Sequence, residues 1–96
     1  MDKEKIRDNL FNANVKEVSN CVMAVANGMQ NYKNHIQLLS LAYGFITWCK
    51  ITKQNPQDVF LAIDNISKYH GGIRPEFLAV ENYLKKEVIS NVENIK

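Results

Sequence analysis

The sequence predicts an all-α fold, a compact bundle of four main helices preceded by a short N-terminal helix. Two prolines and four glycines interrupt the 96 residues, which leaves long uninterrupted segments. Apolar residues recur at spacings of three and four, the period of a helix face. Cap and start signals divide the chain into five expected helices. They cover residues of about 3–12, 15–27, 35–53, 56–70 and 75–94, and a chain of this length is expected to form one domain, 1–96.

The stretch 34–53 is the most apolar in the chain, holds the only Trp, and predicts the central helix. Asn34 is expected to cap it, with Gln37 as the reciprocal partner. Its apolar residues cover more than half of the circumference, whereas a surface helix needs a stripe of only about 100°. We therefore expect neighbours on nearly all sides, and expect Tyr43, Phe45 and Trp48 to be core residues rather than interface hot spots.

An uncharged strip of the same helix remains, with small residues in its middle. Small residues allow another helix to approach closely, either from the same chain or from a second copy. The simpler alternative is a moderately exposed polar strip on a core helix. As interface candidates, the strip contributes Ser40, Gly44, Thr47 and Ile51.

The other helix boundaries follow from local cap chemistry. Asn14, with Glu17 as its partner, predicts the start of the helix at 15–27, and Gly28 is expected to follow it in the left-handed conformation. Asn55 followed by Pro56 predicts the start of 56–70. The remaining signals are the pair Gly71-Gly72, which ends that helix, and Pro75, which starts the last one and requires an extended Arg74.

The last helix carries one continuous apolar seam, beginning with Phe77 and Val80. A helix of about 20 residues is roughly 30 Å long, more than the rest of a small domain can cover. The end of the seam is therefore expected to fray or to contact another chain. Its residues are Val88, Val92 and Ile95.

The composition excludes several classes of protein. A net charge of +2 is too small to imply a nucleic-acid partner. The apolar run 36–49 is shorter than the ~20 residues that a bilayer requires, and the first residues do not form a signal peptide, so no membrane association is expected. Cys21 and Cys49 are accordingly expected to be reduced and buried in a cytoplasmic protein.

No catalytic, metal or cofactor motif is evident. His35 and His70 are the only histidines, and neither stands in the spacing of a hydrolase triad or a zinc site. Two cysteines without nearby His or Cys partners make no zinc site. We therefore expect a protein that is not an enzyme and that binds no metal and no cofactor.

One alternative function is the binding of a phosphate-bearing small ligand at the turn 71–75. Glycines allow a ligand to approach the backbone, and the start of the last helix offers free N–H groups. The simpler interpretation, a turn between two helices, is favoured because the pair of glycines lies in no known phosphate-binding motif. The candidate ligand-binding residues are Lys68, His70, Gly71, Gly72 and Arg74.

A second alternative is a helix-turn-helix DNA-binding regulator, since two helices are expected to meet at a glycine turn. The second helix would then carry basic and amide side chains near its start. The sequence there, PEFLAVEN, is acidic and apolar. Binding of nucleic acid is not expected.

The main hypothesis is a small non-enzymatic module that acts as a homo-oligomer and binds another protein. It rests on two expectations. The central helix needs neighbours on nearly all sides, and the rest of the chain does not cover the end of the apolar seam on the last helix. Its expected action is that of an inhibitor or adaptor. Short asparagine-rich helical chains are frequent among products of phages and mobile elements, which is the source expected for this one.

Overall fold

The computed structural model describes residues 3–89, without the side chains of residues 88 and 89. In this part of the chain the fold is all-α, as the sequence predicts. One short antiparallel hairpin interrupts it. The elements in chain order are α1 Lys3–Phe11, α2 Val15–Gly28, α3 Asn34–Thr52, α4 Pro56–Ser67, β1 Lys68–Tyr69, β2 Gly72–Ile73, α5 Pro75–Tyr83 and the π-helical segment η1 Leu84–Ile89.

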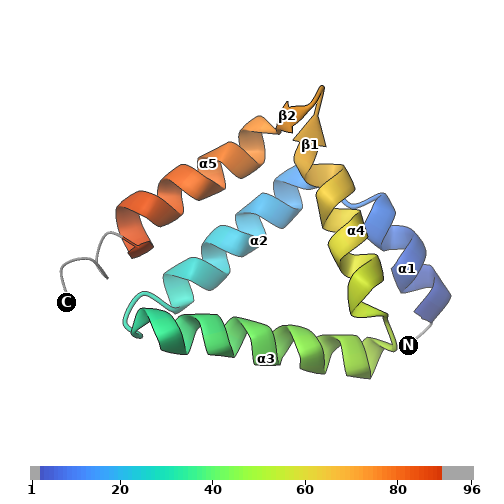
Figure 1. Ribbon diagram of the computed structural model, residues 1–96, viewed down its shortest axis with the longest axis horizontal. Helices are drawn as coiled ribbons and strands as arrows, with labels where there is room; N and C mark the ends of the chain where they lie inside the picture. Colours follow the sequence, from blue (N-terminus) through green and yellow to red (C-terminus); the bar gives the residue numbers. More distant parts are fainter. Residues whose placement is uncertain (1–2, 90–96) are drawn as a thin grey trace.

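Helices α2, α3 and α4 form the three sides of a flat frame (Figure 1). The molecule measures 44 × 32 × 18 Å along its principal axes. Helix α1 packs on the outer side of α4, and α5 with η1 packs along α2. Helix α3 lies along the remaining side and makes no comparably extensive contact with any described element.

Three predicted helix starts are confirmed. The Asn14 side-chain oxygen accepts a hydrogen bond from the N–H of Glu17 at 3.0 Å, at the start of α2. The side chain of Asn55 accepts from the N–H of Gln57 at 2.9 Å, and Pro56 is the first residue of α4. Before α5, Arg74 is extended (φ −65°, ψ 145°), as a residue that precedes proline should be.

Two predicted caps are wrong. Asn34 is the first helical residue of α3, and Lys33 takes the cap position without a side-chain hydrogen bond. Gln37 does not close a capping box because its side-chain amide donates to the carbonyl oxygen of Met29 at 2.8 Å. Gly28 remains helical, and Met29 follows it with a negative φ, so no left-handed glycine ends α2.

Helix α4 ends three residues before the predicted boundary because the chain enters a β-hairpin. Lys68 pairs with Ile73 and Tyr69 pairs with Gly72. His70 and Gly71 form the turn, with φ values of 50° and 79°. Positive φ at both central residues is typical of the tight turns that suit the twist of two strands. His70 therefore does not lie on the last turn of a helix, where the sequence pattern placed it.

The last predicted helix, 75–94, is divided. Helix α5 ends at Tyr83, and the chain continues as η1 to Ile89. Phe77 and Val80, the start of the apolar seam, are buried as expected. Tyr83 also bonds α5 to α2, because its hydroxyl group donates to the side-chain oxygen of Asn27.

The buried part of the described chain is small. Its buried apolar residues are mostly of small or medium size, and no large side chain is fully buried. Cys49 is buried as expected, whereas Cys21 is exposed, contrary to the prediction. The buried apolar residues are Ala26, Cys49, Ala62, Phe77 and Val80.

Within residues 3–89, no helix combines the length and the apolar character that crossing a bilayer requires.

Candidate interaction surface

Helix α3 is not enclosed by the other helices of its own chain. Trp48 is 71% exposed and Tyr43 is 74% exposed, although the sequence pattern placed both in the core. The reason lies in the packing partners, since α1 covers α4 and α5 covers α2, which leaves no helix to cover α3. We call the exposed large apolar side chains of this helix the α3 surface. They are Ile36, Leu38, Leu39, Leu41, Tyr43, Ile46, Trp48 and Ile51.

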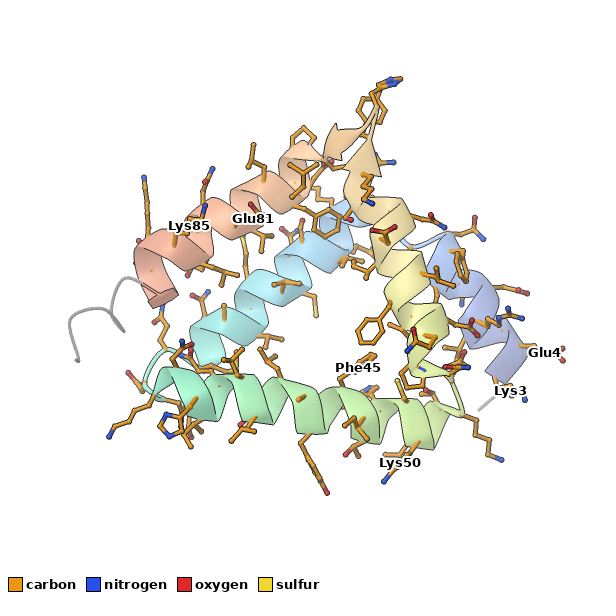
Figure 2. The ribbon with its side chains drawn as sticks, in the orientation of Figure 1. Lys3, Glu4, Phe45, Lys50, Glu81 and Lys85 are labelled. Atoms are coloured by element: carbon orange, nitrogen blue, oxygen red, sulfur yellow. The ribbon has the colours of Figure 1, made fainter. Side chains whose placement is uncertain are left out.

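The side of α3 that faces the frame is only partly packed. Figure 2 shows Phe45 pointing from α3 towards the inside of the frame, and Lys50 lying on the other side of the helix. The ring of Phe45 contacts the ring of Phe60 from α4, with a centroid separation of 5.1 Å and a tilt of 39°. Cys49, one turn after Phe45 on the same side of α3, is buried. These contacts hold α3 to α4 but leave most of its circumference open.

An apolar hollow of about 490 Å³ adjoins the α3 surface. Four helices contribute to it: α1, α2, α3 and α4. None of the described residues that line it carries a charge. They are Ile6, Leu10, Val25, Ser40, Leu41, Gly44, Phe45, Trp48, Cys49, Thr52, Gln54 and Val59.

The α3 surface extends around the helix. Its eight side chains are between 40% and 74% exposed. At 100° per residue Tyr43 lies about 160° from Leu41, and Ile46 lies about 160° from Trp48, so the eight side chains belong to more than one face. A surface helix normally buries its apolar stripe, and this one leaves most of its large apolar side chains exposed to water.

The strip predicted as an interface borders this surface. Ser40 and Gly44 line the hollow, and Ile51 is 66% exposed. Thr47 is half-buried. The other predicted interface residues belong to the end of the last helix. The side chain of Val88 is not described, and Val92 and Ile95 lie outside the described residues.

The predicted ligand-binding residues lie on the hairpin and beside it. The Nζ atom of Lys68 forms an ion pair with Asp64 at 2.8 Å. The His70 ring packs edge-on against the Tyr69 ring at 4.2 Å, and the Arg74 guanidinium lies 5.4 Å from the centre of the same Tyr69 ring. Lys68 thus pairs with Asp64, whereas the His70 and Arg74 side chains both contact Tyr69. Gly71 and Gly72, both exposed, supply the turn and the second strand.

The hairpin also separates α4 from α5. A helix-turn-helix joins its two helices by a turn of three or four residues. Here β1, a two-residue turn and β2 lie between them, so this pair of helices does not form that motif.

The described residues offer no cluster of three His, Cys, Asp or Glu side chains that could hold a metal ion. His35 is exposed at the start of α3. A smaller depression of about 220 Å³ lies where the start of α1 meets the turn between α3 and α4. It is lined by side chains of both charges, including the ion pair between Arg7 and Asp58 at 3.3 Å.

No protein-family model, curated protein or solved structure matches this chain.

Sequence reasoning missed the exposure of Tyr43 and Trp48. The signal that could have revealed it was already present, because a helix that is apolar around most of its girth needs several partners. The other helices of the described residues 3–89 do not supply them.

Proposed function

We propose that this protein is a non-enzymatic protein-interaction module that associates with itself through the α3 surface. The observation that carries the proposal is the exposure of Trp48 and Tyr43 among eight exposed large apolar side chains of one helix. Trp and Tyr are enriched among residues that dominate binding energy at interfaces. Burying this surface against another chain would remove it from water, which is favourable at about 25 cal/mol per Å² before the costs of association are subtracted.

The thin core supports the same proposal. A chain of this size buries only about two-thirds of the surface of its unfolded state. Here the described part contains no fully buried large side chain. Association through α3 would add the buried apolar area that the single chain lacks. The proposal includes a cytoplasmic location, where the free thiols of Cys21 and Cys49 would stay reduced.

Light scattering over a concentration series from low to high micromolar tests the proposal. We expect the mass of the wild-type chain to rise to at least twice 11.0 kDa. Trp48→Glu should remain a monomer, because a carboxylate would have to be desolvated in the interface. Tyr32→Glu is the matched control, since Tyr32 is 61% exposed and lies in the loop between α2 and α3 rather than on α3 itself.

A wild-type chain that stays monomeric at high micromolar concentration would refute self-association. If the wild type associates and Trp48→Glu associates as strongly, self-association stands but does not use the α3 surface at Trp48.

A further inference from the structure

The apolar hollow has the dimensions of a small-molecule site. Its volume of about 490 Å³ lies within the range of about 300–1,000 Å³ that is typical of ligand pockets. An apolar cavity of about 150 Å³ is already large enough to bind benzene. The hollow therefore has room for a molecule of about two or three aromatic rings.

Small residues on one side of α3 leave space for the hollow. The α3 residues that line it lie within about half of the circumference of that helix. Among them Ser40 and Gly44 are one turn apart, and a Cβ atom added at Gly44 would meet nothing within 4 Å. Phe45 points from α3 towards the inside of the frame (Figure 2). Ile6 and Leu10 of α1 also line the hollow, so it is a concave site shared by several helices rather than one face of α3.

The polar groups of the lining are largely engaged within the chain. The hydroxyl group of Thr52 donates to the carbonyl oxygen of Trp48 at 2.7 Å. The Nε2 atom of Gln54 donates to the carbonyl oxygens of Lys3 and Thr52. None of the described lining residues is charged, so a charged ligand would lose its hydration here without gaining an ionic partner. The lining therefore favours a neutral, mostly apolar molecule.

Two aromatic side chains contribute to the lining. The ring of Phe45 is held by its contact with Phe60 of α4, at a centroid separation of 5.1 Å. Trp48 lines the hollow although it is 71% exposed, so a molecule bound there would cover part of its ring. Aromatic rings gain from offset or edge-to-face contacts in addition to the burial of their area. A ligand that carries rings would make such contacts with both side chains.

We propose that the hollow between α1, α2, α3 and α4 binds a neutral, apolar small molecule of about two or three aromatic rings. The ligand contacts Phe45 and Trp48 and removes apolar lining from water, which drives the binding. This inference goes beyond the proposed function and does not require self-association, because the residues of a single chain form the site.

Titration with two fluorescent probes of matched shape tests this site. N-phenyl-1-naphthylamine is neutral and has three aromatic rings, and 8-anilino-1-naphthalenesulfonate is the same molecule with a sulfonate group. We expect one neutral probe to bind per chain, with a dissociation constant of about 1–100 μM. The sulfonate should bind at least about tenfold more weakly, because it finds no cationic partner in the hollow. Trp48 is the only Trp in the chain, so quenching of its emission by the bound neutral probe reports contact at this site.

A pair of leucine variants locates the bound probe. Gly44→Leu places a side chain in the hollow and should weaken binding of the neutral probe at least about tenfold, because overpacking is unfavourable. Ala42→Leu is the matched control and should bind like the wild type, since Ala42 is exposed and lies about 160° away around α3. Circular dichroism verifies that Gly44→Leu keeps its helices. Ser40→Leu, which fills the hollow from one turn earlier, replaces it if it does not fold.

Four results would overturn the proposal. They are no saturable binding of the neutral probe up to its solubility limit, equally tight binding of the sulfonate, equally tight binding to Gly44→Leu, and a stoichiometry of one probe per two chains. The last result would place the site between copies. Self-association is measured separately, by light scattering without a probe, so either proposal can fail while the other stands.

Discussion

Lys53 adopts a left-handed backbone conformation after the last turn of α3, with φ 57° and ψ 39°. This conformation costs an L-amino acid roughly 1–2 kcal/mol, because its Cβ approaches the following carbonyl oxygen. Helices commonly end with a glycine at this position for that reason. Residue 53 therefore stores strain at the sharp turn that leads into α4.

Replacement of Lys53 by Gly should increase the free energy of unfolding by about 0.5–1 kcal/mol. The relief of strain exceeds the additional entropy that glycine loses on folding. Urea unfolding at one fixed protein concentration measures the change. Lys50→Gly, within the last turn of the same helix, is the control and should decrease stability by about 1 kcal/mol. Equal losses in both variants would contradict the role assigned to residue 53.

At the scale of elements, one buried side chain ties the start of α1 to the turn between α3 and α4. Gln54 is buried, and its Nε2 atom donates to the carbonyl oxygen of Lys3 at 2.7 Å and to that of Thr52 at 3.0 Å. The ion pair between Arg7 and Asp58 spans the same junction but is largely exposed on the Arg side, so it contributes little. Gln54 thus joins the first helix to the turn between α3 and α4.

Gln54→Ala should loosen α1 while leaving the other helices in place. Loss of a buried hydrogen bond costs about 1–2 kcal/mol, which corresponds to amide exchange in α1 faster by roughly 5–30-fold. Hydrogen exchange with mass spectrometry measures this change peptide by peptide. Gln57→Ala is the control because Gln57 is exposed in the first turn of α4. Unchanged exchange in α1 would show that Gln54 is not its anchor.

At the scale of the whole molecule, the proposed self-association is expected to be coupled to folding, because the other helices cover little of α3. Two pairings, α1 with α4 and α2 with α5, account for the most extensive contacts between helices. Helix α3 closes the frame, and among its large side chains Phe45 packs on α4 through Phe60. The stability of such a molecule depends on whether α3 is covered.

The melting temperature of the wild type should therefore rise with protein concentration, by about 3 °C for each tenfold increase if it unfolds from a dimer. Calorimetry or circular dichroism at several concentrations provides the measurement. Trp48→Glu should melt at one temperature throughout. A wild-type melting temperature independent of concentration would contradict coupling between folding and association.

Local chemistry accounts for what could be predicted from the sequence. Asn14 and Asn55 cap helices, and Pro56 and Pro75 start them, because each acts on backbone groups within three residues of itself. Gln37 could not be predicted in the same way. Its side-chain amide can bond to a nearby backbone group or to the preceding loop. The path of that loop brings the Met29 carbonyl oxygen to the amide of Gln37.

The sequence by itself determined that the chain is helical, where most of its helices begin, and that α3 is apolar around most of its girth. Only the tertiary structure decided that Trp48 and Tyr43 face water and that His70 and Gly71 form a hairpin turn. Apolar periodicity indicates how much surface a helix must bury. It does not indicate whether the residues that cover this surface come from the same chain or from another one. Because α1 packs on α4 and α5 packs on α2, neither α1 nor α5 covers α3.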